Sequence, residues 1–446
     1  MEGQLTGWGR TAPTTATLCA PTTAAEAAAA LRDAGGRGAV ARGLGRSYGD
    51  AAQNAGGTVL DMTRLAAVQS LDLEQGLVGV EAGVSLDKLM RLLLPFGWFV
   101  PVTPGTRYVT VGGAIGADIH GKNHHLSGSF SQHVTRMRLL TADGATHELR
   151  PGDELFDATA GGMGLTGVIL DATIQLLPVS TSLMTVDTER ADDLDDLMHR
   201  LETTDHRYRY SVAWIDLVAR GAATGRAVLT RGEHATPDML SPRQLADPLA
   251  FRPRSFPAAP RGIPGGLLRT ATVGAFNELW FRKAPREKRG QLQRIGAFFH
   301  PLDGVPDWNR VYGRAGFLQY QFVVPYGQEA VLRSIVEQLS RHGCPSFLAV
   351  LKRFGEGGPG WLSFPMPGWT LALDLPATVP GLGPLLDRLD EQVLAAGGRI
   401  YLAKDSRMRP QSLPGMYPKL ADFRALRERI DPHGAFTSDL ARRLAL

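Results

Sequence analysis

The sequence of 446 residues contains only two cysteines, Cys19 and Cys344. Two cysteines are too few for a disulfide framework or a structural zinc site. They do not indicate whether the protein resides in an oxidising or a reducing compartment. No uninterrupted apolar run approaches the length that crosses a bilayer, and the first residues, MEGQLTGWGRTAP, lack the basic region and apolar core of a signal peptide. We therefore expect any contact with a membrane to be peripheral. The sequence does not indicate which side of the membrane is involved.

The sequence also lacks a strong excess of either charge. Lysine and arginine number 48, and aspartate and glutamate number 44, which gives a net charge of +4. This small basic excess is compatible with an anionic ligand or a membrane surface, and we expect no nucleic acid partner. The composition, 43% hydrophobic and 21% charged, is that of a globular protein, and the length predicts two or three domains.

Short apolar runs separated by glycine-rich turns fill the first part of the chain. The segments TVLDM, AVQSLDL and LVGVEAG are typical of strands, and residues 85–96 have the pattern of a helix capped by Ser85. Asp143-Gly144 indicates a hairpin. These patterns predict an α+β unit over residues 1–178.

A second region, residues 179–395, combines strand-like runs such as FLQYQFVVP and FLAVLKRF with an amphipathic helix that ends at Gly343. We interpret it as a substrate-binding domain with an antiparallel sheet and helices on one face. Within it, residues 242–269 are rich in Pro, Arg and bulky apolar residues, which is typical of a lid, a binding loop or a disordered connector. The last segment, 396–446, is expected to return to the first domain, since an undocked tail would be poorly ordered.

Three glycine-rich stretches are candidate ligand sites. Residues 162–167 match G-x-G-x-x-G, but the strand-like run VILDATIQLL follows where a phosphate-binding helix should begin, so we exclude a nicotinamide-binding Rossmann site. The other two are residues 43–50 (GLGRSYGD) and residues 112–121. Their backbone N–H groups, free of side-chain bulk, suit a pyrophosphate, although a single such loop is more often a tight turn.

The histidines of HGKNHH do not predict a metal site. His124 and His125 are adjacent and rarely face one ion, and no nearby Cys or Glu completes a ligand set. We expect no metal.

The two glycine stretches, joined by short strands, resemble the FAD-binding domain of the vanillyl-alcohol-oxidase flavoprotein superfamily. The segments TGWGRTAP, GGAIGADIHGKNHHLSGSF, FNELWFRKAPR, LSFPMPGW and YLAKDSR narrow the resemblance to members that oxidise decaprenylphosphoryl-β-D-ribose. The resemblance implies a two-domain, PCMH-type fold with an antiparallel-sheet substrate domain, and FAD bound mainly by the N-terminal half.

The implied reaction converts the 2′-hydroxyl of this lipid-linked sugar phosphate to a 2′-keto intermediate. It is the first half of epimerisation to the arabinose used for cell-wall arabinan, and a separate NAD(P)H-dependent keto-reductase subunit would complete it. The alternatives are an oxygen-using alditol or aldonolactone oxidase of the same superfamily, or a non-catalytic flavin-binding partner of the reductase. The lipid tail implies a membrane contact, for which Arg252, Arg254 and Arg261 are the candidates.

By resemblance, the pyrophosphate lies against residues 43–51 and the isoalloxazine lies near residues 112, 113 and 117–120. The residues expected at the cofactor are Gly43, Leu44, Gly45, Arg46, Ser47, Tyr48, Gly49, Asp50, Ala51, Gly105, Thr110, Val111, Gly112, Gly113, Ala117, Asp118, Ile119, His120, Ile169 and Tyr401. Many superfamily relatives have a histidine in the first glycine loop that is covalently tethered to the flavin. This chain has Arg46 there, so we expect non-covalent FAD with the guanidinium as a charge partner.

Lys404 is the first candidate for the group that accepts the hydroxyl proton, because a lysine in a dry site loses its proton more readily. Without the resemblance, an exposed ion pair with Asp405 would be the ordinary interpretation. His120 and Tyr48 are further catalytic candidates, with loop bracing and core packing as their alternatives. The residues expected at the substrate are Trp214, Tyr312, Gln319, Gln321, Lys352 and Thr370.

Two residues depart from the best-known relatives. Thr370 and Ala372 stand where those relatives carry Asn and Cys. Redox chemistry belongs to the flavin and is expected to persist. Because this position has no thiol, inhibitors that react covalently with a thiol are expected to form no adduct with the protein. An adduct detected by intact-protein mass spectrometry would contradict this expectation.

Overall fold

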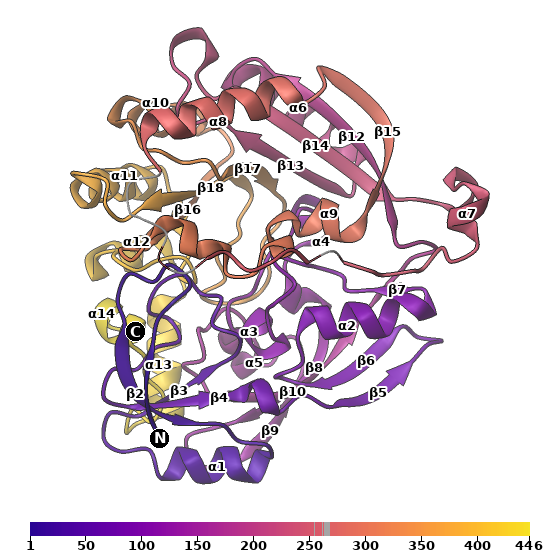
Figure 1. The fold of residues 1–446 in the computed structure, drawn as a ribbon. Helices are drawn as coiled ribbons and strands as arrows, with labels where there is room; N and C mark the ends of the chain where they lie inside the picture. The colour runs from indigo at the N-terminus through magenta and orange to yellow at the C-terminus, as the bar shows by residue number, and fades with distance from the viewer. Residues whose placement is uncertain (254, 261, 263–267) are drawn as a thin grey trace.

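The computed structural model describes residues 1–253, 255–260, 262 and 268–446. Figure 1 shows a lower part, formed by the first elements of the chain together with its last helices, and an upper part formed around one large sheet. Both termini lie in the lower part. The α+β class and the antiparallel sheet of the second region are confirmed. The domain boundaries at residues 178 and 395 stay predictions.

The described residues of the lower part form two larger sheets and a two-stranded one, which pairs β7 (Trp98–Phe99) with β11 (Leu177–Pro178). The first has the order β1-β2-β4-β3, with β1 (Glu2–Leu5), β2 (Thr14–Cys19), β4 (Thr58–Asp61) and β3 (Ala39–Arg42). Strands β2, β4 and β3 are parallel, and α1 (Ala24–Arg32) connects β2 to β3. Because β3 ends at Arg42, the first glycine stretch begins where this strand leaves the sheet.

The second sheet of the lower part is antiparallel. Its order is β5-β6-β10-β8-β9, with β5 (Val68–Asp72), β6 (Leu77–Glu81), β10 (Val168–Gln175), β8 (Val134–Leu140) and β9 (Thr146–Leu149). The predicted hairpin at Asp143-Gly144 joins β8 to β9. Helix α2 (Leu86–Leu93) begins after Ser85, whose hydroxyl accepts the N–H of Lys88, so the predicted cap is confirmed.

The second glycine stretch is not a loop throughout. Residues Val111–Gly116 form the short helix α3, whose cap Thr110 accepts the N–H of Gly113 at 3.2 Å. A Cβ on Gly112 would lie 3.0 Å from the Cβ of Ala82, so this glycine lets α3 lie close to the chain that follows β6. The threonine cap and this close packing explain why a glycine-rich segment is helical.

The upper part is an eight-stranded antiparallel sheet. Its order is β15 (Glu287–Arg294), β12 (Leu183–Ala191), β14 (Ala227–His234), β13 (Tyr210–Ile215), β17 (Ala349–Phe354), β18 (Gly368–Pro376), β16 (Phe317–Pro325) and β19 (Arg399–Ile400). One face packs against α6 (Leu194–Thr204), α10 (Glu329–His342) and α11 (Leu382–Ala395) in one core cluster. As predicted, α10 ends at Gly343, which has a φ of 73°. The other face of the sheet looks toward the lower part.

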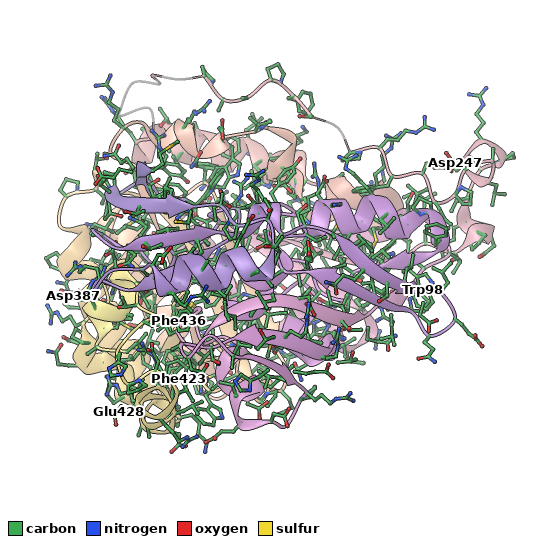
Figure 2. All side chains as sticks on the ribbon, turned by 90° about the horizontal axis from the view of Figure 1, so that it is seen from below. Trp98, Asp247, Asp387, Phe423, Glu428 and Phe436 are labelled. Carbon is green, nitrogen blue, oxygen red and sulfur yellow. The ribbon has the colours of Figure 1, made fainter. Side chains whose placement is uncertain are left out.

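The C-terminal segment docks on the lower part. Its helices are α12 (Leu413–Met416), α13 (Leu420–Ile430) and α14 (Asp439–Leu444). Phe436 is buried with Ala27 and Leu31 of α1, and Figure 2 shows it beside the N-terminal elements. Arg443 donates to Asp50 at 2.7 Å and to Asp405 at 2.7 Å. This ion pair network joins the first glycine stretch to the loop that carries Lys404.

The range 242–269 begins with helix α7 (Pro242–Leu245), which projects from the body (Figure 1). Arg252 is exposed and lies 3.4 Å from Asp247. Arg254 and Arg261, also expected at lipid headgroups, lie outside the described residues. Among the described helices, none has the length and apolar character that a membrane span requires.

Candidate active site

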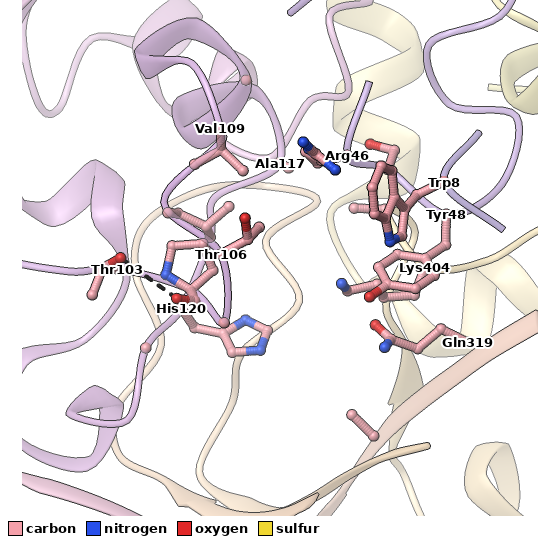
Figure 3. A pocket seen from close by; sticks show the side chains of 18 of the residues that line it. Trp8, Arg46, Tyr48, Thr103, Thr106, Val109, Ala117, His120, Gln319 and Lys404 are labelled. Atoms are coloured by element: carbon pink, nitrogen blue, oxygen red, sulfur yellow. Dashed lines mark hydrogen bonds between the residues drawn. The ribbon is translucent and has the colours of Figure 1, made fainter. Parts of the chain in front are cut away.

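A cavity of about 690 Å³ lies where both glycine stretches face the open side of the large sheet (Figure 3). This volume is in the range of ligand and cofactor sites. The predicted site residues that line it are Gly43, Leu44, Gly45, Arg46, Ser47, Tyr48, Ala51, Gly105, Thr110, Gly112, Gly113, Ala117, Ile119, His120, Ile169, Trp214, Gln319, Gln321, Lys352, Tyr401 and Lys404. Residues that lie far apart in the chain are therefore brought to one space.

Six other predicted residues are not among those that line the cavity: Gly49, Asp50, Val111, Asp118, Tyr312 and Thr370. The Asp118 carboxylate accepts the hydroxyl of Ser129 at 2.8 Å and the N–H of Ser131 at 3.0 Å, so it braces the loop after α3. Asp50 is occupied by Arg443, and Thr370 donates to the carbonyl of Phe322. These side chains have partners within the protein, and their contact with the cofactor or the substrate stays a prediction.

Backbone contacts bring Lys404 to the first glycine stretch. The Tyr48 N–H donates to the Ala403 carbonyl at 2.9 Å, and the Lys404 ammonium lies 3.9 Å from the centre of the Tyr48 ring. Tyr401, in the same loop, donates through its hydroxyl to the Ala117 carbonyl at 2.7 Å. One loop of the C-terminal segment thus touches both glycine stretches.

Lys404 has the electrostatics of a proton acceptor. Loss of hydration in the cavity lowers its pKa to about 7, and the carboxyl of Asp374 opposes that shift. Burial in turn raises the pKa of Asp374 to about 7. Gln319 donates to this carboxyl at 2.6 Å, and the hydroxyl of Tyr312 lies 3.4 Å from it. Near neutral pH, this pair can take up or release a proton at little cost.

His120 faces this group from the opposite wall, as Figure 3 shows. The Gln321 amide nitrogen lies 2.9 Å from its Nε2, and the rings of Phe354, Phe364 and Tyr401 surround it. Burial and the charge of Lys352 hold the pKa of His120 well below its usual range, so the imidazole stays neutral. With the amide donating to Nε2, Nδ1 carries the proton, and this nitrogen has no partner among the described residues.

Two more lysines face the cavity. Burial lowers the pKa of Lys352 to about 8 and that of Lys122 to about 7. The Lys352 ammonium lies 3.5 Å from the Gly121 carbonyl, whereas Lys122 donates to the carbonyl of Phe298 and lies 4.3 Å from its ring. An anionic ligand that restores the charge of these amines would be strongly favoured.

Some lining residues were not predicted from the sequence. Trp8 holds the Arg46 guanidinium 3.9 Å from its ring centre, and Met163 and Gly164 belong to the excluded G-x-G-x-x-G stretch. We excluded a Rossmann site at this stretch because a strand was predicted where a phosphate-binding helix should begin. The structure has the strand β10 there. Period-two alternation in GWTLALDL could have drawn attention to Asp374, which shares a sheet face with Ala372.

Comparison with known proteins assigns the family. A family model of an FAD binding domain matches residues 15–150, and a model of D-arabinono-1,4-lactone oxidase matches residues 383–444. The chain is 46% identical to the decaprenylphosphoryl-beta-D-ribose oxidase of Mycolicibacterium smegmatis, over 99% of this chain and 97% of that protein. The chain belongs to this oxidase family. FAD is its cofactor.

More distant relatives share the architecture. The alditol oxidase of a Streptomyces species is 24% identical over 91% of this chain and 90% of its own length. The solved structure of Physcomitrella patens BBE-like 1 matches with a TM-score of 0.66 and 16% identity, covering 94% of this chain and 89% of that one. The latter likeness shows a shared fold.

The cavity fits the cofactor of this oxidase family. Gly105 and Gly164 face open space in it, with nothing within 4 Å of an added Cβ, so backbone approaches the ligand directly. The Arg46 guanidinium, the amines of Lys352 and Lys404 and the unpartnered Nδ1 of His120 offer positive charge and a hydrogen bond for an anionic dinucleotide.

Acid precipitation is expected to release all of the flavin into the supernatant. The first glycine stretch offers Arg46 and no histidine, and His120 is the single histidine in the described cavity lining, placed on the second stretch. A yellow protein pellet would contradict non-covalent binding. The variant His120→Ala would then show whether the imidazole is the point of attachment.

Proposed function

We propose that the chain oxidises the 2′-hydroxyl of decaprenylphosphoryl-β-D-ribose to the 2′-keto sugar. The observation that carries this proposal is the Lys404 amine, which lies over the Tyr48 ring and lines the same cavity as the two glycine stretches, and whose pKa is about 7. An amine of that pKa is half neutral at neutral pH and can accept a hydroxyl proton. The 46% identity to a decaprenylphosphoryl-beta-D-ribose oxidase agrees with this substrate.

Each polar side chain at the site has a separate role in the proposed reaction. Lys404 takes the proton of the 2′-hydroxyl as the C–O single bond becomes a carbonyl. FAD, when bound, would supply the oxidant as acceptor of the hydride from C2′. Lys352 binds the substrate phosphate, and His120 with Gln321 orients the sugar from the facing wall. The charge of Asp374 opposes the fall in the pKa of Lys404.

The product implies a partner and a location. A 2′-keto sugar becomes the arabinose epimer only when a hydride arrives on the opposite face, so we propose an NAD(P)H-dependent keto-reductase as partner in a step toward cell-wall arabinan. A polyprenyl substrate resides in a membrane, and we propose a peripheral contact there. The exposed Arg252 could meet anionic headgroups.

An oxygen-using alditol oxidase is the second candidate, supported by the 24% identity to such an enzyme. Lys122, Lys352 and Lys404 favour a phosphorylated substrate over a neutral alditol, since a neutral substrate leaves buried amines without an anion. Reoxidation of the reduced protein by air separates the two: fast reoxidation supports the alditol oxidase.

Anaerobic mixing of the holoenzyme with decaprenylphosphoryl-β-D-ribose tests the proposal. The flavin colour is expected to bleach, with free ribose and xylitol as controls that leave it unchanged. Absence of bleaching by the lipid substrate, or equal bleaching by xylitol, would overturn the proposed function. Absence of bleaching by every sugar would favour the non-catalytic alternative.

The rate of this bleaching is expected to rise with pH through about 7, because only the neutral amine of Lys404 accepts a proton. Asp374 stabilises the ammonium, while Lys352 destabilises it. Asp374→Asn removes the stabilising carboxylate, lowers the pKa of Lys404 and moves this rise to lower pH by about one unit. The measurement is the limiting rate of reduction across pH.

Asp390→Asn is the matched control. Burial also raises the pKa of Asp390 to about 7, but its carboxylate pairs with Arg407 and is not among the charges that shift the pKa of Lys404. This variant should leave the midpoint unchanged. The role assigned to Asp374 fails if Asp374→Asn and Asp390→Asn give the same pH midpoint as the parent protein.

A further inference from the structure

The cavity continues beyond the polar site into an apolar arm. We use this name for the space lined by Val212 and Trp214 of β13, Val228 of β14, Leu348 just before β17, and Val350 of β17. The roles assigned above to the cavity residues leave most of this space unused. Trp214 satisfies its own N–H by donating to the Phe347 carbonyl at 3.0 Å, so its ring presents an apolar surface.

Strand register connects the arm to the polar site. Val228 pairs with Trp214, Trp214 with Val350, Val350 with Ala372, and Ala372 with Gln321. Residues paired across neighbouring strands share one face and lie side by side. The row therefore runs without a break from apolar side chains to the amide that contacts His120.

The arm is an open wall of mainly apolar side chains, with Thr230, the partner of Val212, also in the cavity lining. On the opposite face of the same strands, Ala213, Leu229 and Leu351 are 0% exposed in the helix-covered core. Trp214 and Val350 are only half-buried, although they stand in the middle of the large sheet. Apolar surface left open inside a protein is costly unless a ligand covers it.

The charged part of the cavity and the apolar arm meet on strand β17. Val350 and Lys352 are two residues apart on β17, and both line the cavity. Side chains at this spacing point to the same face of a strand. A ligand with a phosphate on Lys352 would place the atoms attached to that phosphate against Val350.

The arm opens toward helix α8 (Thr270–Lys283). Trp280 lines the cavity and is also 45% exposed, and on the same helix Phe276 is 45% and Leu279 is 67% exposed. Positions 276, 279 and 280 form one stripe of a helix, and the Phe276 and Trp280 rings stack. A chain leaving the arm would meet this exposed apolar stripe on the outside of the upper part (Figure 1).

We infer that the apolar arm binds the isoprene units next to the phosphate of the lipid substrate, and that the rest of the prenyl chain leaves over the α8 stripe. This inference rests on the proposed function for its substrate. The arm supplies an apolar wall, the β17 junction supplies the phosphate end, and the stripe supplies the exit. Recognition of the substrate then includes its lipid as well as its sugar.

The test is the affinity of the FAD-loaded protein for geranyl, farnesyl and geranylgeranyl phosphate below their micelle concentrations. Each added isoprene buries apolar surface, so affinity is expected to rise at least about tenfold from the first to the last. Val350→Gln and Trp280→Gln are expected to reduce this gain to about twofold or less, because an amide replaces the apolar contact. Val305→Gln, an exposed valine outside the cavity lining, is the matched control and should keep it.

Equal affinity for all three phosphates in the parent protein would overturn the inference. A full chain-length gain in both Val350→Gln and Trp280→Gln would also overturn it, as would loss of the gain in Val305→Gln. If Val350→Gln does not retain FAD, the inference is tested by the chain-length gain of Trp280→Gln, because Trp280 is partly exposed. These ligands carry no ribose, so binding is measured apart from oxidation. Failure of flavin bleaching with an intact chain-length gain would refute the proposed function and leave the prenyl site standing.

Discussion

The variant Lys404→Ala is expected to reduce bound FAD with substrate about a thousandfold more slowly than the parent protein, the loss that removal of a general base produces. The Lys404 amine lies over the Tyr48 ring, and its pKa of about 7 makes it half neutral when the substrate binds. Neighbouring Asp374 is occupied by Gln319. Anaerobic stopped-flow measurement at saturating substrate gives the limiting rate.

Two observations separate a chemical role of Lys404 from a structural one. FAD content should remain at the level of the parent protein, because the backbone contact of Ala403 with Tyr48 does not use the lysine side chain. Small alkylamines should restore part of the rate by entering the space of the lost amine. A limiting rate within tenfold of the parent protein would show that another group takes the proton.

Lys352→Met provides the contrast within the same cavity. Lys352 is assigned to the phosphate, so its loss should weaken substrate binding and leave the limiting rate of reduction much less affected. A raised KM for Lys352→Met with a collapsed limiting rate for Lys404→Ala would divide binding from chemistry. The reverse pattern would exchange the two assignments.

The variant Gly43→Ala is expected to purify without FAD. A Cβ at Gly43 would collide with the hydroxyl of Thr110, which caps α3. The methyl group would push the two glycine stretches apart, although both must face the same cofactor. A displacement that costs about 3 kcal/mol weakens binding by more than about a hundredfold.

The flavin-to-protein absorbance ratio measures this effect. Gly36→Ala is the matched control, because nothing lies within 4 Å of a Cβ there and the position is exposed. It should purify with the same colour as the parent protein. A yellow Gly43→Ala protein with a full complement of FAD would contradict the placement of the cofactor against both stretches.

Patterns within single segments were sufficient for much of the fold. Ser85 caps α2, Gly343 ends α10, and Asp143-Gly144 joins β8 to β9, each as expected. These features depend on backbone angles and on hydrogen bonds to residues a few positions away, so a short stretch contains the necessary information. The same holds for Gln319 and Gln321, whose alternation on β16 already places them on one face.

Contacts between distant segments decided the rest of the site. Asp374 acts on Lys404 because β18 and the loop after β19 meet. Asp50 is held by Arg443, and Asp118 is held by Ser129 and Ser131, partners that the sequence did not indicate. The apolar arm exists only because three strands present Trp214, Val228 and Val350 side by side. Burial and charge compensation are properties of the assembled interior, and no local pattern specifies which partner a buried charge will find.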